Sequence, residues 1–141
     1  MQSSVLRLFT MDKERIQEGA PIYFPKNPDG SIPTFYVARS HTSNPEWLAA
    51  NERENAKYKG RMRANQMTAE DWSNITRKVF LSVLLKGWEN FLDKDGNQIP
   101  YNAENAEKYI TEYPELYEYL AAQATDDENF RKAAMEEDAG K

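Results

Sequence analysis

The 141-residue chain contains no cysteine, so disulfide bridges and thiolate metal sites are excluded. It also lacks long apolar runs: those it has, such as residues 83–85, are far shorter than the roughly 18 residues of a membrane helix. Residues 1–7 show no basic region followed by an apolar core, which argues against a signal peptide. We therefore expect a soluble protein that is not exported.

Catalytic signatures are missing as well. The sequence has no His-Glu-x-x-His zinc motif, no phosphate-binding glycine loop and no dinucleotide fingerprint. His41 is the only histidine, and its position beside Ser40 does not indicate a catalytic triad, whose three groups must converge in space. With 23 acidic residues, some carboxylate pair always looks suggestive. We expect no enzymatic activity, no catalytic residue and no cofactor.

Charge is present but unevenly distributed. Residues 1–63 carry ten Lys/Arg against seven Asp/Glu, whereas residues 102–141 carry four against eleven. A basic front and an acidic tail are compatible with head-to-tail self-association, that is a homo-oligomer, or with a polar partner. The plainer interpretation, two ordinary solvated faces, is preferred on general grounds.

The first 40 residues are predicted to form a β-rich segment that packs on the helical part. Residues 5–9 are a candidate strand, and residues 22–24 and 34–38 flank a turn-forming Asn-Pro and Asp-Gly segment. The two flanking runs predict a β-hairpin, with Tyr23, Phe35 and Val37 on one face.

The rest of the chain predicts helices. Asn44 caps a helix that should end at Gly60, Thr68 caps one that should run to Trp88, and Asn102 caps another. Pro114 starts a fourth helix, and Thr125 begins a capping box for a last one. The sequence thus predicts a mainly α fold, a small helical domain at 41–135 with an N-terminal β-hairpin and a frayed acidic tail at 136–141. The expected core of the central helix comprises Trp72, Ile75, Val79, Phe80, Val83, Leu84 and Trp88.

The break after this central helix invites a calcium interpretation. Asp93, Asp95, Asn97 and Glu104 fall at positions one, three, five and twelve of a calcium-binding loop. However, Gly96 lies at position four rather than six, Pro100 at position eight has no N–H, and no second loop exists to pair with. A structural turn is the better interpretation, and we expect no metal site.

Two groups of side chains are candidates for partner binding. Five basic residues between 53 and 63 lie near one tyrosine, a combination that can bind nucleic acid. Neighbouring acidic residues and the net negative charge of the chain argue against nucleic-acid binding. A solvated connection or a contact with an acidic protein surface is preferred, and Arg61 and Arg63 are the candidate residues for such a contact. Tyrosines beyond the needs of the core are typical of protein contact surfaces; we select Tyr113, Tyr117 and Tyr119.

Several short motifs follow one another in an informative order. They are FYVAR at 35–39, SNP at 43–45, GWENFLDKDG at 87–96, IPYNAEN at 99–105 and ATDDENF at 124–130. In this order the chain resembles the tail assembly chaperones of long-tailed bacteriophages over residues 35–130. The segment before Phe35 has no counterpart in that pattern.

The resemblance implies a non-enzymatic role in the cytoplasm of the host bacterium. Such chaperones bind the helical tape-measure protein and keep it soluble until tail tube protein polymerises around it. They are often made in two lengths by a programmed frameshift, and they are absent from the virion. The alternatives are a virion structural protein, such as a tail or head–tail joining subunit, and a calcium-binding helix-loop-helix module. Membrane binding is not expected, and nucleic acid is disfavoured.

Overall fold

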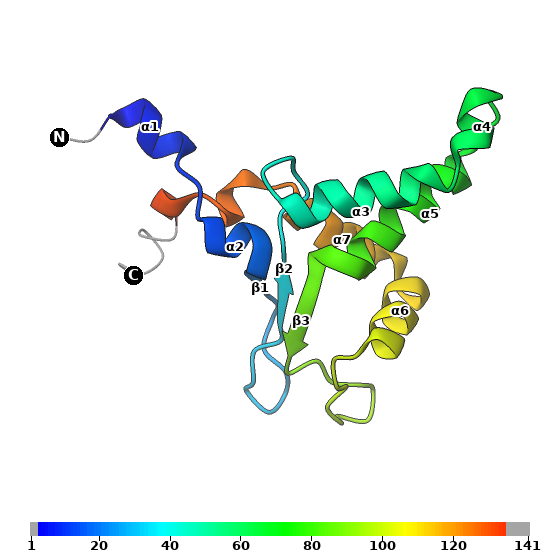
Figure 1. Ribbon diagram of the computed structural model, residues 1–141. Helices are drawn as coiled ribbons and strands as arrows, with labels where there is room; N and C mark the ends of the chain where they lie inside the picture. The colour runs from blue at the N-terminus through cyan, green and yellow to red at the C-terminus, as the bar shows by residue number, and fades with distance from the viewer. Residues whose placement is uncertain (1–2, 135–141) are drawn as a thin grey trace.

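The centre of the protein is a three-stranded antiparallel sheet (Figure 1). The computed structural model describes residues 3–134, and the acidic tail expected at 136–141 lies outside that range. Strand β2 (Thr34–Val37) pairs with β1 (Ala20–Tyr23) on one side and with β3 (Leu85–Glu89) on the other. The predicted mainly α fold with only a hairpin is therefore wrong: a third strand makes the architecture a mixed one.

The third strand replaces the last turns of the helix expected to reach Trp88. Helix α5 (Ala69–Val79) widens into a π-helical turn, η1 (Phe80–Leu84), and Leu85 then takes an extended conformation with φ −78° and ψ 110°. The free edge of β2 supplies backbone partners for the segment that follows, and glycine at position 87 weakens the helical alternative. Tertiary pairing overrides a local pattern that favours helix.

The predicted β-hairpin is confirmed, but its inward face differs. Ile22 pairs with Phe35, and both are buried, whereas Tyr23 pairs with Thr34 and is 65% exposed. Residues directly opposite each other share a face of the sheet, so Ile22 rather than Tyr23 lies with Phe35 and Val37. These three side chains enter the main core.

A helical arm extends from the sheet at the upper right of Figure 1. It consists of α3 (Pro45–Ala56), α4 (Lys59–Arg63) and α5, and α3 packs along α5. The side chain of Asn44 caps α3 as predicted, and Thr68 and Asp71 form the capping box of α5. Gly60, however, lies inside α4 and does not end α3.

Helices α6 (Ala103–Glu112) and α7 (Pro114–Ala124) begin where the sequence predicts, at Asn102 and Pro114. The following capping box does not start a full helix: Asp126, not Thr125, caps a single 3₁₀ turn, η2 (Asp127–Asn129). Apolar side chains of α6 and α7 join those of the sheet and η1 in the main core, which includes Phe35, Val37, Phe80, Trp88, Ile110 and Leu120.

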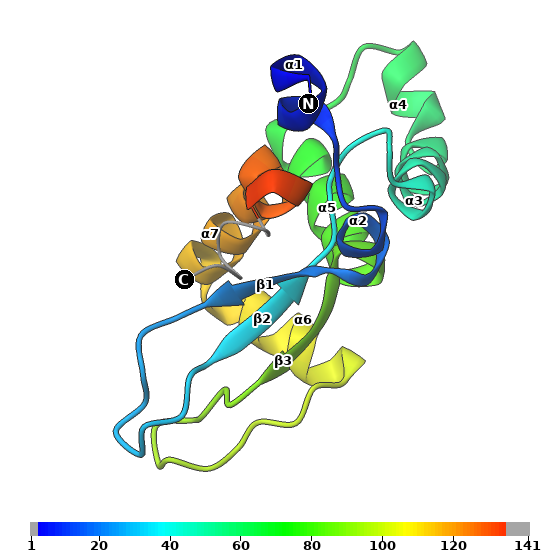
Figure 2. The ribbon, with the colours of Figure 1, turned by 90° about the vertical axis from the view of Figure 1, so that its left-hand side faces the viewer.

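The N-terminal segment is helical where a strand was expected at residues 5–9. Ser3 caps α1 (Ser4–Phe9), and Asp12 caps α2 (Lys13–Glu18). Ile16 and Ala20 then bury Phe130 in a second, smaller core, so the beginning and the end of the described chain lie side by side (Figure 2).

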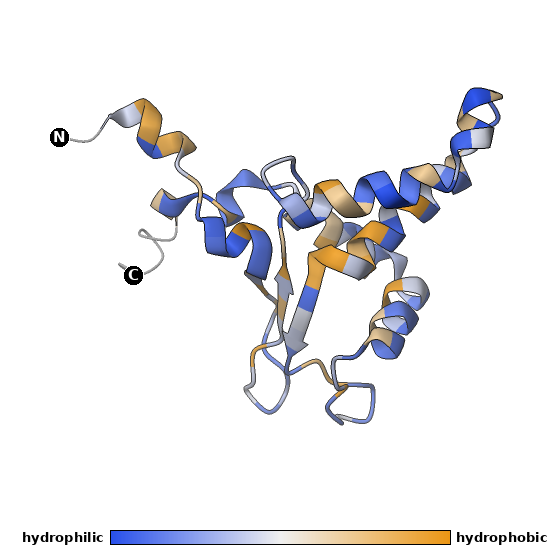
Figure 3. Cartoon of the chain, in the orientation of Figure 1, coloured by the Kyte–Doolittle hydropathy of each residue, from blue (hydrophilic) through white to orange (hydrophobic). Residues whose placement is uncertain are grey.

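Five of the seven predicted core residues of the central segment are buried. Val83 is only half-buried, and Trp72 is 49% exposed because it lies on the outer side of α5. The hydropathy colouring shows apolar residues along α5 and η1 (Figure 3). Ile75 and Val79 of α5 pack with Ala50 of α3, whereas η1 contributes to the main core. The members that are buried are Ile75, Val79, Phe80, Leu84 and Trp88.

Asn44 is fully buried and uses both ends of its amide. Its Nδ2 donates to the carbonyls of Ile16 at 3.1 Å and Arg39 at 3.0 Å, while its oxygen caps α3 through the N–H of Glu46. We expect Asn44→Ala to lower the free energy of unfolding by about 2 kcal/mol, because the cap is lost and the carbonyl of Arg39 loses its donor. The carbonyl of Ile16 still accepts the N–H of Arg39. Asn44→Asp should cost more, because a carboxylate keeps the cap but cannot donate.

Urea denaturation of the variants measures this difference. Asn102 provides the matched control, since it caps α6 through Asn105 but is exposed. Asn102→Asp should change stability by no more than about 0.5 kcal/mol. An Asn44→Asp protein as stable as the wild type would show that the two donated hydrogen bonds contribute nothing.

The capping box of α5 makes stability depend on pH. The N–H of Thr68, and next the Arg61 guanidinium at 2.7 Å, lower the pKa of Asp71 below its ordinary value. The ionised side chain therefore stabilises the fold above the unfolded-state pKa of about 3.9, and this contribution is lost as the pH falls below it. We expect Asp71→Asn to destabilise the protein clearly at pH 7 and much less at pH 3.

Urea titrations at the two pH values test this expectation. Glu70→Gln, one residue earlier in the same helical turn, is the control and should show a smaller change between them. Equal destabilisation by Asp71→Asn at both pH values would contradict the role given to the charge.

Candidate partner-binding surface

One hollow among the described residues is an open apolar groove. It lies between the loop that follows β3 and helices α6 and α7, with a volume of about 550 Å³. Its apolar walls are formed by Phe91, Leu92, Ile99, Tyr109, Tyr113 and Leu116. Asp93, Asp95, Glu112, Lys94 and Lys108 surround it. A groove of this size and composition can accept apolar side chains of a partner.

A tight hairpin turn forms one wall of the groove. Leu92 and Gln98 form an isolated antiparallel bridge, and the N–H of Asp93 donates to the carbonyl of Asn97 at 2.9 Å. Gly96 has a φ of 84°, a conformation that glycine adopts without strain. The turn therefore presents Leu92 in a defined place.

The same turn replaces the calcium loop considered from the sequence. The carboxylate of Asp93 accepts the backbone N–H groups of Asp95 and Asn97, each at 2.9 Å, as in an Asx turn. Among residues 3–134 no group of three or more acidic or histidine side chains is arranged to hold a metal ion. The geometry is that of a structural corner.

A series of aromatic contacts connects the groove to the core. Phe35 lies 5.2 Å from Phe91, Phe91 lies 5.2 Å from Tyr109, and Tyr109 stacks on Tyr113 at 6.0 Å, measured between ring centroids. Aromatic pairs at these distances favour each other beyond simple burial. The wall of the groove is thus built on the buried centre of the sheet.

The three predicted tyrosines do not form one surface. Tyr113 is 43% exposed and lines the groove, whereas Tyr117 is half-buried and packs edge-on against Phe80 at 5.2 Å. Burial raises the pKa of the Tyr117 phenol. Tyr119 is exposed elsewhere on α7, where it contacts Phe24. Only Tyr113 belongs to the groove.

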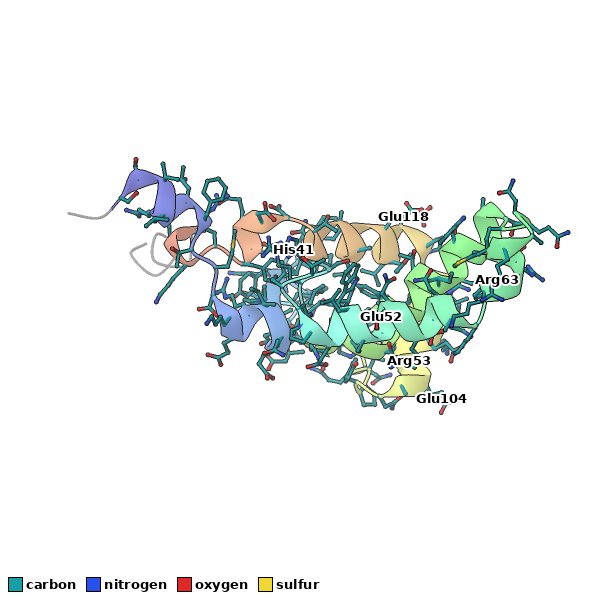
Figure 4. The ribbon with its side chains drawn as sticks, turned by 45° about the horizontal axis from the view of Figure 1, so that its top comes forward. His41, Glu52, Arg53, Arg63, Glu104 and Glu118 are labelled. Atoms are coloured by element: carbon teal, nitrogen blue, oxygen red, sulfur yellow. The ribbon has the colours of Figure 1, made fainter. Side chains whose placement is uncertain are left out.

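The two predicted arginines lie on the arm, away from the groove. Arg61 Nη1 contacts both carboxylate oxygens of Asp71, at 2.7 and 2.8 Å, so its charge serves the cap of α5. Arg63 is exposed at the end of α4, and Figure 4 shows it on the arm, apart from Glu104 on α6 and Glu118 on α7. Arg63 is accessible to a partner, but the arm and the groove are separate surfaces.

Sequence reasoning missed most of the groove. Phe91 and Leu92 were not selected, since they are a short apolar pair in a polar stretch, and Leu116 was expected only as part of a helix's apolar stripe. A usable signal existed: the apolar pair Phe91-Leu92 stands directly before a tight turn and Ile99 directly after it, which places them on facing arms. The residues of α6 and α7 that face them could be identified only from the tertiary structure.

Other polar features of the described chain are structural. Arg39 is buried and pairs with Asp127 at 2.9 Å, and His41 contacts Ser43 through Nδ1 at 2.9 Å rather than Ser40. No helix in the part of the chain that the structure describes is long and apolar enough to cross a membrane.

Comparison with known proteins identifies the group to which the chain belongs. No curated protein and no solved structure matches it. Residues 42–141 match the profile of the YdaY prophage protein family, which covers well over half of the sequence and indicates a phage origin. The match begins just before α3 and includes the arm, β3, the groove and both helices beside it. The chain belongs to the family of YdaY prophage proteins.

Proposed function

We propose that the protein is a non-enzymatic assembly factor of a phage tail, a tail assembly chaperone that binds the tape-measure protein. The observation that carries the proposal is the open groove of six apolar side chains, placed on the core by the aromatic contacts. Phage origin supplies the context, and the order of the short motifs resembles that of tail assembly chaperones.

The groove suits an apolar stripe on a partner helix. A tape-measure helix exposes such stripes before the tail tube protein surrounds it, and side chains at i, i+3 and i+4 would enter the space between Leu92 and Tyr113. Helices α6 and α7 carry five glutamates and one lysine, so basic residues beside the stripe would be favoured. Binding would take place in the host cytoplasm, where tails assemble.

Coexpression with the tape-measure protein of the same genome tests the proposal. We expect the wild type to raise the soluble fraction of the tape-measure protein several-fold and to copurify with it. Leu92→Lys/Tyr113→Lys should abolish both effects, because two ammonium groups would have to be buried against the apolar stripe. Leu48→Lys, an exposed change on α3, is the control and should retain both effects.

The outcome that contradicts the proposal is equally clear. A wild-type protein that leaves the tape-measure protein insoluble is not its chaperone. Rescue that persists in the groove variant, with its fold verified by circular dichroism, would assign binding to another surface, such as the arm that bears Arg63.

A structural subunit of the particle is the rival function, and purified virions distinguish the two. A chaperone leaves the tail when the tube is complete, so mass spectrometry of gradient-purified particles should detect the tube protein and not this chain. Detection of the chain in stoichiometric amounts would assign it to the tail or the head–tail joint.

A further inference from the structure

We propose that a second hollow, between the helical arm and α7, binds a small uncharged heterocycle that carries both a carbonyl and an N–H group. This arm–α7 hollow has a volume of about 300 Å³ and shares no lining residue with the apolar groove. The proposal does not rest on the proposed function, because a partner helix in the groove and a ligand in the arm–α7 hollow would occupy different sites.

The interior of the arm–α7 hollow is apolar and aromatic. Trp47 of α3 lines it, together with Phe80 and Leu84 of η1. Tyr117 of α7 forms the facing wall and packs edge-on against Phe80, with the ring centroids 5.2 Å apart. Walls of aromatic and aliphatic side chains favour a flat apolar ring system.

Three side chains at the arm–α7 hollow have donors that are available to a ligand. Within residues 3–134, the hydroxyls of Ser40 and Tyr117 have no hydrogen-bond partner. Asn51 accepts the side-chain amide of Asn55 on its Oδ1 at 3.2 Å, which leaves the Asn51 Nδ2 group to donate elsewhere. A carbonyl oxygen on the ligand would accept from this set of donors.

Two threonine hydroxyls at the same hollow can only accept. Thr76 Oγ1 donates to the carbonyl of Trp72 at 3.0 Å, and Thr125 Oγ1 donates to the carbonyl of Ala122 at 2.9 Å. Each hydroxyl has a single hydrogen, so its lone pairs are what remains for a ligand, and an N–H group would pair with them. None of the residues that line the hollow is charged, which favours an uncharged ligand.

This set of donors and acceptors disfavours the apolar side chain of a partner protein. A leucine or phenylalanine side chain would remove Ser40, Asn51 and Tyr117 from water without giving them hydrogen bonds, which is unfavourable. An indole supplies an N–H but no acceptor and would leave the same three donors unpaired. A ring that contains both a carbonyl and an N–H, as in an aromatic lactam, pairs with both sets.

The volume of the hollow sets the size of the ligand. A dry protein cavity of about 150 Å³ holds benzene, so a hollow of about 300 Å³ has room for two fused rings. Ala121 keeps this space open, since it lines the hollow one helical turn after Tyr117 and a larger side chain there would fill it. A two-ring aromatic lactam therefore fits the hollow in size and in hydrogen bonding.

Titration of isotope-labelled protein with carbostyril, a two-ring aromatic lactam, tests the proposal by NMR. The three tryptophans act as separate reporters, because Trp47 lines the hollow, Trp72 lies on the outer side of α5 and Trp88 is buried on β3. We expect a saturable shift of the Trp47 indole N–H signal and little change in the other two. Trp47→Phe assigns the signal.

Variants of α7 relate the binding to the hollow and to its hydrogen bonds. Ala121→Leu should abolish the binding of carbostyril, whereas Ala122→Leu, the same change at the exposed neighbouring position, should retain it. Tyr117→Phe keeps the ring against Phe80 and removes the hydroxyl alone. It should weaken the binding of carbostyril about fivefold and leave the binding of indole, which has no acceptor, unchanged. Circular dichroism confirms the fold of each variant.

Three results would overturn the proposal. They are the absence of a saturable shift at Trp47, a folded Ala121→Leu protein that binds carbostyril as the wild type does, and a Tyr117→Phe protein that binds carbostyril with unchanged affinity. None of them affects rescue of the tape-measure protein, and loss of rescue leaves the shift of Trp47 in place. Failure of this proposal and failure of the proposed function are therefore distinguishable.

Discussion

The burial of Trp88 is the constraint on which most of the molecule depends. Its indole lies on β3 against Phe35 of β2, with centroids 5.5 Å apart, and its Nε1 donates to the carbonyl of Ile99 at 2.7 Å. That hydrogen bond holds the chain beside β3 after the turn. Tyr101 then packs edge-on against the indole, and the Tyr101 hydroxyl donates to the carbonyl of Leu85 at 2.8 Å. The start of α6, and with it one side of the groove, follows from this placement.

A second set of contacts, which are polar, stabilises the end of the molecule that lies away from the groove. Asn44 connects α2, the end of β2 and the start of α3, and the buried Arg39 pairs with Asp127 beyond α7. These polar contacts are satisfied inside a small domain, where an unpaired group would be costly. They place the N-terminal segment beside Phe130, which explains why the apolar α1 emerges at the end of the molecule that lies away from the groove.

The groove and helix α1 thus depend on two separate structural supports. The groove is connected to the aromatic centre of the sheet, whereas α1 is held by the guanidinium of Arg131, whose Nε donates to the carbonyl of Leu8 at 2.7 Å, and by backbone contacts of the residues that follow it. Membership of the YdaY prophage family places these features in a phage, and the assembly role stays a proposal.

Local chemistry determined much of the helical framework. Asn44, Thr68, Asn102 and Pro114 each start the helix that their capping or backbone preferences predict, and the hairpin formed between residues 20 and 37. These features depend on neighbours in sequence, which is why they could be predicted. Of the three selected tyrosines, only Tyr113 lies in the groove. A sequence can indicate that a tyrosine is exposed, but it does not show which exposed residues from different elements meet in one surface.

Only the tertiary structure decided the third strand, the helical α1 and the groove. Residues 85–89 follow an amphipathic helix without a break in pattern, yet they extend because β2 offers a partner edge and Phe35 a surface for Trp88. The groove joins a turn at residues 91–99 with side chains of α6 and α7, and no local preference specifies that meeting. The sequence by itself therefore determined where most helices begin. Where the central helix ends and which residues line the groove depend on backbone pairing and burial between distant segments, and these only the tertiary structure decides.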